Sequence, residues 1–135
     1  MATRYLLDTN ILIAALKGEP CVRQRLETLP LSDLLLSTIV LGELEFGAEK
    51  SAWADRNRQR LAELTRRLPL IGLEASTARH YARIRMQLER MGTPIGANDL
   101  WIAAQALTAD ATLVTNNQRE FLRVQGLVVE NWLND

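Results

Sequence analysis

The chain has 135 residues, a length that suits one domain with its own hydrophobic core. Hydrophobic residues make up 47% and charged residues 24%, with 16 basic and 16 acidic side chains, so the composition excludes a disordered chain and shows no overall charge bias toward nucleic acid. The single cysteine and single histidine, Cys21 and His80, exclude an internal disulfide and a Cys/His zinc site.

Short apolar runs alternate with helical patterns in the first half of the chain. Four-residue apolar runs indicate buried strands, and apolar residues at helical spacing indicate amphipathic helices. In chain order, the expected elements are a strand at 4–7, helices at 9–17 and 21–29, a strand at 34–37, helices at 38–50 and 53–68, and a strand at 70–73. Gly18, Pro30 and Pro69 each end one of these helices.

The second half continues this alternation without a repeat or a linker. The expected elements are helices at 75–91 and 98–109 joined by a turn at 92–96, a strand at 112–115, a short helical turn at 116–122, and a strand at 127–130. Short strands alternating with helices predict an α/β fold with a mostly parallel sheet. Because ligands bind beyond the carboxyl ends of the strands in such sheets, the residues that follow the strands are the candidates for function.

Two acids in the first half occupy unusual positions. Asp8 directly follows the first strand, where helix N-capping is the plain alternative to a chemical role. Glu43 lies four residues after Ile39 and four before Gly47, on the apolar stripe of its helix. Its carboxylate either reaches water at the edge of that stripe or is buried with a partner, because an unpaired buried charge is costly.

Two acids in the second half repeat the pattern. Asp99 precedes the apolar face that includes Ile102, and N-capping of the helix by Asn98 or Asp99 is the plain alternative to a chemical role. Glu120 follows the fourth strand and a turn, and as an isolated acid beside Arg119 it would ordinarily lie on the surface.

The coincidence of these four acids is more informative than any one of them. Asp8, Glu43, Asp99 and Glu120 each lie in or after a segment that leaves a short strand, so we expect them at one edge of the sheet. Close carboxylates repel one another unless a cation neutralises them, which predicts a hard divalent metal, Mg²⁺ or Mn²⁺. The matching chemistry is phosphodiester hydrolysis, in which the metal activates water and stabilises the developing charge.

Four sequence blocks resemble a known family. LLDTNILI, STIVLGELEFGAEKS, GTPIGANDLWIAAQAL and LVTNNQREF…GL…ENW are similar, in order and spacing, to the PIN-domain ribonucleases, in particular the VapC toxins of toxin–antitoxin pairs. The resemblance extends from about residue 4 to Trp132. It implies a single PIN domain over residues 1–135, a three-layer α/β/α fold around a short-stranded, mostly parallel sheet.

The resemblance also implies roles for single residues. Asp8 and Asp99 match the acids that contact Mg²⁺, which Mn²⁺ can replace, and Glu43 matches the acid that helps hold the metal and the water. Glu120 matches a fourth, variable acid, for which contact through water is expected. Small polar residues that orient the acids are expected at Asn10, Thr115 and Asn117. Ordinary turn and cap chemistry is the alternative for these three.

As a whole, the resemblance implies a Mg²⁺-dependent endoribonuclease toxin that cleaves RNA, with tRNA as the expected substrate, and so arrests translation. Expected partners are a VapB-type antitoxin, a second copy of the chain in a homodimer or higher assembly, and operator DNA only through the antitoxin. The lack of an N-terminal signal pattern, and of an apolar run of about 18–20 residues, predicts a cytoplasmic protein without a membrane partner.

Cationic side chains are needed to hold RNA phosphates around the acids. Lys50 and Arg119 lie closest to them in the sequence, and a solvated helix face is the alternative for both. A non-catalytic PIN-like RNA-binding protein is a second possible function, although the presence of all three principal acids argues against it. An aspartate-based phosphotransfer protein is a third, but Asn10 stands where a second acid is needed, and TLVTNNQRE has no lysine.

Overall fold

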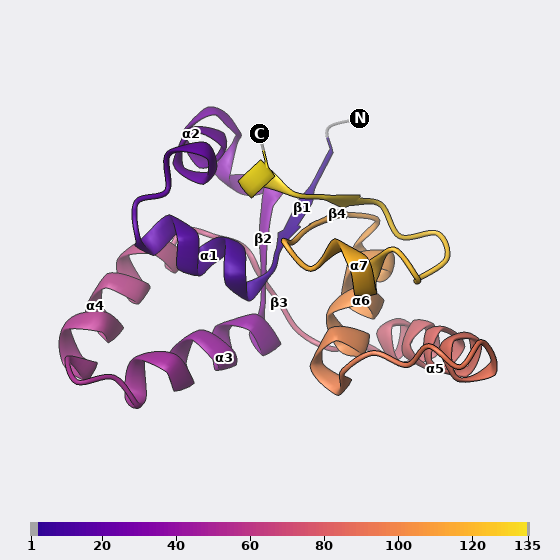
Figure 1. Ribbon diagram of the computed structural model, residues 1–135. Helices are drawn as coiled ribbons and strands as arrows, with labels where there is room; N and C mark the ends of the chain where they lie inside the picture. The colour runs from indigo at the N-terminus through magenta and orange to yellow at the C-terminus, as the bar shows by residue number, and fades with distance from the viewer. Residues whose placement is uncertain (1–2, 135) are drawn as a thin grey trace.

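One parallel sheet organises the fold, which a computed structural model describes for residues 3–134 (Figure 1). Its strands are β1 (Tyr5–Leu7), β2 (Leu34–Ser37), β3 (Leu70–Ile71), β4 (Thr112–Val114) and β5 (Val129–Glu130). They lie in the order β3-β2-β1-β4-β5, and each neighbouring pair is parallel. The first strand of the chain is therefore the central strand of the sheet.

Helices cover both faces of this sheet. They are α1 (Thr9–Leu16), α2 (Pro20–Thr28), α3 (Thr38–Glu49), α4 (Ala54–Thr65), α5 (Ala75–Arg90), α6 (Ala97–Ala109) and α7 (Gln118–Phe121). Figure 1 shows α1–α4 on one side of the strands and α5–α7 on the other, which confirms the predicted three-layer α/β/α fold. Within residues 3–134, none of the helices is long and apolar enough to span a bilayer.

The core lies on both sides of the central strands. Leu6 and Leu7 of β1 and Leu113 of β4 are fully buried, as expected for strands covered on two faces. Helix α6 presents small side chains such as Ala103 and Ala106, also fully buried, so its backbone packs closely against the sheet. This close packing fixes the position of the first turn of α6, which bears Asp99.

Several element ends differ from the sequence predictions. Helix α6 begins at Ala97 with the extended Gly96 as its N-cap, so the capping alternative for Asn98 and Asp99 does not hold. Strand β3 has two paired residues instead of four, because the chain turns away toward α5 after Ile71. Two 3₁₀ turns, Leu31–Asp33 and Trp132–Asn134, were not predicted, since so short a turn leaves no periodic pattern in the sequence.

The strand order creates a crevice next to β1. The chain passes from β1 outward to β3 and then crosses back to β4 on the other side of β1, so the direction of winding reverses between these two strands. Ligands of open α/β sheets bind at such a reversal, beyond the carboxyl ends of the strands. Asp8 follows β1 directly and Thr115 follows β4 directly, so both lie at this position.

Candidate active site

Asp8 is a buried carboxylate at the reversal point. Its backbone N–H donates to the Val114 carbonyl at 2.9 Å, which extends the pairing of β1 and β4 by one residue. Its Oδ1 accepts from the Thr9 N–H at 2.8 Å and its Oδ2 accepts from the Thr115 hydroxyl at 2.7 Å. Burial raises the pKa of Asp8 above its usual value, although these two hydrogen bonds oppose the shift. Asp8 also caps α1, so the capping and chemical interpretations both fit.

Thr9 connects Asp8 with Glu43. The Thr9 backbone donates to Asp8, and its hydroxyl donates to Glu43 Oε1 at 2.8 Å. Glu43 is half-buried on α3. Both alternatives considered for it therefore hold in part, because its carboxylate lies near water and also accepts a hydrogen bond from Thr9. Thr9 was not among the predicted site residues. Its position directly after an acid at the end of a strand could have indicated a role in the site.

Asp99 and Glu120 meet the first two acids from the opposite helical layer. Helix α6 leads into β4, so its N-terminal turn, with Asp99 at the third position, lies at the carboxyl edge of the sheet. The pKa of Asp99 is raised to about 7, first by desolvation, then by a hydrogen bond with Glu120 and by the charges of Asp8, Glu120 and Glu43. The structure therefore brings the four predicted acids together.

The predicted orienting residues differ in what they contact. Asn117 Nδ2 donates to Glu120 Oε2 at 2.9 Å, and its backbone N–H donates to Thr115 Oγ1 at 3.0 Å. Together with the bond from Thr115 to Asp8, this forms a hydrogen-bonded chain between the two carboxylates. Asn10 instead donates to Asn116 Oδ1 at 3.0 Å, so its contact is with a neighbouring loop and not with an acid.

The acids fit a hard divalent cation held partly by water. Within residues 3–134, no three His, Cys, Asp or Glu side chains are arranged to enclose an ion by themselves. Mg²⁺ needs no such cage, because one or two carboxylates and several waters usually bind it. The repulsion that raises the pKa of Asp99 is relieved when a cation neutralises the cluster. Asp8 and Asp99 are the residues that would hold it.

Known proteins match the chain over nearly its whole length. The family model of the PIN domain matches residues 5–127. Ribonuclease VapC2 of Rickettsia felis is 41% identical over 130 residues, which cover 95% of this chain and 97% of that protein. The chain belongs to the VapC ribonucleases of the PIN-domain family.

Other VapC proteins and structures agree. The tRNA(fMet)-specific endonuclease VapC of Shigella flexneri is 39% identical over 130 residues, covering 96% of this chain and 98% of that protein. The structure of VapBC2 from Rickettsia felis bound to promoter DNA superposes with a TM-score of 0.90 at 39% identity, covering 96% of this chain and 99% of that one. DNA-bound VapBC from Salmonella typhimurium gives 0.90 at 38%, covering 97% and 99%.

Membership in the VapC group confirms the predicted fold and the predicted class of enzyme, a nuclease that hydrolyses RNA. It decides against the phosphotransfer and non-catalytic alternatives. PIN-domain nucleases depend on divalent metal ions, in agreement with the donor set at this edge of the sheet.

A buried polar network fixes the two VapC helices that bear Glu43 and Asp99. Gln105 of α6 is almost fully buried and accepts a hydrogen bond from the hydroxyl of Ser37, the N-cap of α3. Its amide also donates to the Gly72 carbonyl after β3, at 3.1 Å. Gln105 was not predicted from the sequence, because its partners at the end of β2 and just after β3 are distant along the chain.

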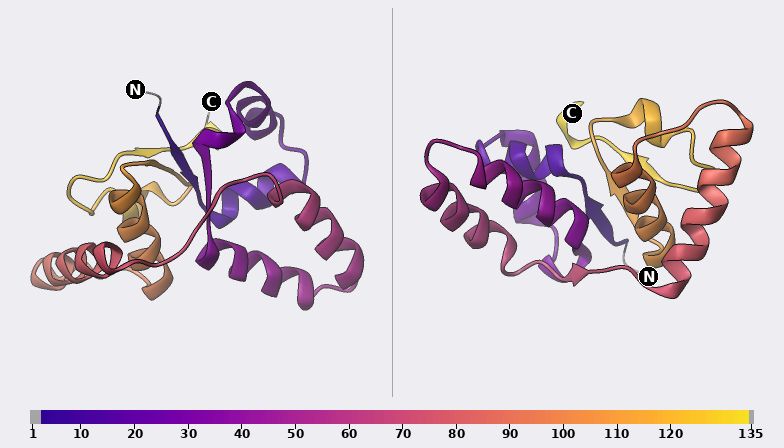
Figure 2. Two further views of the ribbon diagram at one scale, coloured as in Figure 1. Left: turned by 180° about the vertical axis from the view of Figure 1, so that it is seen from behind. Right: turned by 90° about the horizontal axis from the view of Figure 1, so that it is seen from below.

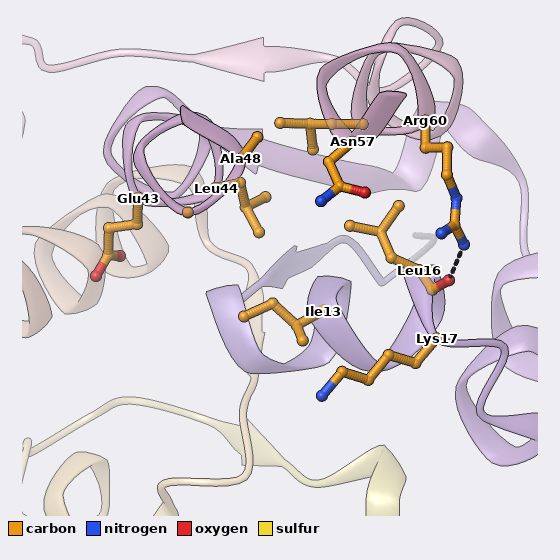
Figure 3. Close-up of a pocket in the computed structure, with 10 residues that line it drawn as sticks. Ile13, Leu16, Lys17, Glu43, Leu44, Ala48, Asn57 and Arg60 are labelled. Atoms are coloured by element: carbon orange, nitrogen blue, oxygen red, sulfur yellow. Dashed lines mark hydrogen bonds between the residues drawn. The ribbon is translucent and has the colours of Figure 1, made fainter. Parts of the chain in front are cut away.

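A cavity of about 600 Å³ opens between α1, α3 and α4, next to the acids. Its lining includes Ile13 of α1 and Leu44 of α3, and Glu43 stands at one end (Figure 3). Lys17 and Arg60 supply positive charge, with Arg60 fixed by a 2.7 Å bond from Nη2 to the Leu16 carbonyl, which Figure 3 also shows. The cavity is therefore apolar inside and cationic at its border.

The two predicted cations have different relations to the acids. Arg119 directly precedes Glu120 in α7 and is exposed. Lys50 follows the end of α3, seven residues after Glu43, which is about 10 Å along the helix. Its ammonium lies 5.1 Å from the centre of the exposed Phe46 ring. Between Lys50 and Arg119, only Arg119 is adjacent in the sequence to one of the four acids.

Proposed function

We propose that this protein is a Mg²⁺-dependent endoribonuclease toxin that cleaves tRNA and is neutralised by a VapB-type antitoxin. The observation that supports this most directly is the meeting of Asp8, Glu43, Asp99 and Glu120 at one sheet edge, where burial and then their mutual interaction raise the pKa of Asp99 to about 7. The tRNA(fMet)-specific relative supports initiator tRNA as the first substrate to test. Such a substrate places the enzyme in the cytoplasm.

The side chains have separate tasks in this mechanism. Thr9 and Thr115 fix the two oxygens of Asp8, which with Asp99 would hold the cation. When bound, the cation supplies an activated water and stabilises the charge that develops on the phosphate. Thr9 binds Glu43 through Oε1 only, so the other oxygen is the one to accept a proton from the attacking water. Asn117 places Glu120 beside Asp99, where contact with the cation through water is expected.

The cavity between α1, α3 and α4 is the site proposed for the antitoxin. An apolar segment of a partner would fill its interior, and an acidic residue would pair with Lys17 or Arg60 at its border. Because Glu43 lies at one end, an occupant would also cover the carboxylates. Ile13→Asp is expected to weaken inhibition by the antitoxin at least 10-fold while the free toxin keeps its cleavage rate. Unchanged inhibition would reject this location.

Larger assemblies form part of the proposal. Two solved relatives, those of Rickettsia felis and Salmonella typhimurium, are VapBC complexes bound to DNA, in agreement with operator binding through the antitoxin. Large apolar side chains such as Phe46, Trp53, Met86 and Leu122 are more than half exposed, which supports burial against a second copy in a homodimer. Light scattering of the free toxin and of the complex measures both assemblies.

A cleavage assay tests the proposed activity. Purified protein is incubated with a tRNA(fMet) transcript in Mg²⁺, in Mn²⁺ and in excess EDTA, together with the Asp99→Asn variant and the exposed control Asp55→Asn. Cleavage should require the metal, disappear in Asp99→Asn and persist in Asp55→Asn. Full activity in EDTA or in Asp99→Asn would reject the proposal.

A further inference from the structure

A second, smaller cavity lies where α5 and α6 meet, and we propose that it binds one unpaired base of the RNA substrate. Figure 2 shows the two helices side by side in both views. The cavity has a volume of about 210 Å³, and its lining includes Tyr81, Arg85, Glu89, Ala97 and Leu100. This inference rests on the proposed RNA cleavage and adds a determinant of where the RNA is cut.

A stacked aromatic pair forms one wall of the cavity. The rings of Tyr81 and Trp101 lie 3.9 Å apart between centres and only 12° from parallel. Trp101 covers one face of the Tyr81 ring, Tyr81 and Arg85 both line the cavity, and the Arg85 guanidinium lies 6.0 Å from the centre of the Tyr81 ring. A base in the cavity would pack against the Tyr81 ring and the Arg85 guanidinium, and base–aromatic stacking contributes about 1–3 kcal/mol per base.

Polar groups with fixed positions line the same cavity. Arg85 donates from Nη1 to the Tyr81 hydroxyl at 2.9 Å and from Nε to Glu89 Oε2 at 2.7 Å. A guanidinium has five N–H donors, so further donors remain, and Glu89 has a second oxygen that can accept. A donor and an acceptor held next to an aromatic face match what a base presents at its edge and its ring.

The cavity adjoins the carboxylates through the first turn of α6. Ala97 and Leu100 line it, and Asp99 stands between them in sequence with its side chain toward Glu120. At a rise of about 1.5 Å per residue, the cavity wall and the carboxylate belong to one helical turn, so a base bound in the cavity would belong to a nucleotide near the cleaved phosphate. The volume is below the roughly 300–1,000 Å³ typical of sites for larger ligands, which favours a single ring system over a peptide.

Abasic substitution combined with mutation tests the proposal. Each transcript is a tRNA(fMet) with one nucleotide near the mapped cut made abasic. For the wild type, one abasic position is expected to lower kcat/KM about 10-fold, the size of a lost stacking contact. Tyr81→Leu should lower kcat/KM on the intact transcript by about the same factor, and the abasic substitution at that position should then lower it no further. Tyr81→Phe keeps the ring, so with this variant the abasic substitution should again lower kcat/KM. The proposal would be overturned if the Tyr81→Leu and abasic substitutions lowered kcat/KM independently, so that their factors multiplied at every position.

Matched variants separate base binding from other roles of α5. Arg85→Met should abolish the same positional effect, whereas Arg83→Met, an exposed arginine of the same helix outside this cavity, should not. An equal loss in both would indicate general phosphate attraction and overturn the proposal. So would a change of molar mass in light scattering for Arg85→Met, because the cavity would then be a contact between copies. Melting curves confirm that each variant is folded.

A binding assay keeps this proposal distinct from the proposed function. In the Asp99→Asn background, 2-aminopurine is placed in turn at the same positions of the transcript. Its fluorescence should be quenched at one position on binding, and the quenching should disappear when Arg85→Met is added. If no metal supports cleavage by the wild type, the proposed function fails while this signal still reports the base site. The absence of quenching at all positions overturns the base site alone.

Discussion

Replacing Asp99 by asparagine is expected to stabilise the metal-free protein at neutral pH. The pKa of Asp99 is about 7 in the folded protein, compared with 3.8 for the free side chain, chiefly because burial disfavours the ionised form. Between about pH 4 and pH 7 the folded state therefore retains a proton that the unfolded chain has lost, so the free energy of unfolding falls as the pH rises. This difference corresponds to about 4 kcal/mol at full burial, and solvent screening of the half-exposed side chain reduces it to about 1–2 kcal/mol.

Asparagine has no charge at any pH and still donates to Glu120, so the variant avoids this penalty. Thermal melts without divalent ions should coincide near pH 4.5, and at pH 7.5 the variant should melt about 3–8 °C higher than the wild type. The matched control Asp55→Asn removes an exposed carboxylate that pairs with Arg58 at 3.2 Å, and it should shift neither curve appreciably. A lower melting temperature for Asp99→Asn at pH 7.5, or an equal gain at both pH values, would refute the reasoning.

Three further predictions concern the groups around the acids. Thr115→Val removes the donor to Asp8 Oδ2, so it should lower the free energy of unfolding in urea by about 1–3 kcal/mol and also lower the cleavage rate. Thr115→Ser keeps the hydroxyl and should retain both the stability and the cleavage rate. Unchanged stability in the valine variant would contradict this. Gln105→Leu leaves Ser37 and a backbone carbonyl without their partner, so unfolding measurements should show a loss of about 1–3 kcal/mol, and a neutral result would count against the network. Mn²⁺ at pH 7.5 should raise the melting temperature of the wild type, by up to about 2.7 kcal/mol of stability at 100 times its dissociation constant, but not that of Asp99→Asn. A wild-type curve indifferent to Mn²⁺ would argue against the metal site.

The sequence was sufficient to locate the four acids because parallel sheets follow a simple rule. Asp8 follows an apolar run, and Glu43 interrupts an apolar stripe, so both stand out without knowledge of the tertiary structure. The N-cap of α6 was not identified from the sequence because Gly96 provides no side-chain signal, while the neighbouring polar residues resemble caps. The fold class was therefore predictable where single boundaries were not.

Side-chain partners were harder to predict than positions. The hydroxyl of Thr9 reaches Glu43 only because α3 packs beside α1, and Asn10 meets Asn116 because the first turn of α1 lies next to the loop after β4. Gln105 occurs in an apolar helix, and its sequence neighbours give no sign that it bonds to Ser37 at the end of β2 and to Gly72 after β3. Such contacts join residues more than 30 positions apart, so they depend on how the layers pack.

The central position of β1 has a consequence during protein synthesis. The strand made first pairs with β4, whose residues 112–114 come near the end of the chain, and Thr115 and Glu120 come later still. On a ribosome, the emerging chain therefore lacks one neighbour of its central strand and one side of the carboxylate cluster until β4 and α7 have been made. A ribonuclease directed at translation would thus complete its cutting site only after these two segments have left the ribosome.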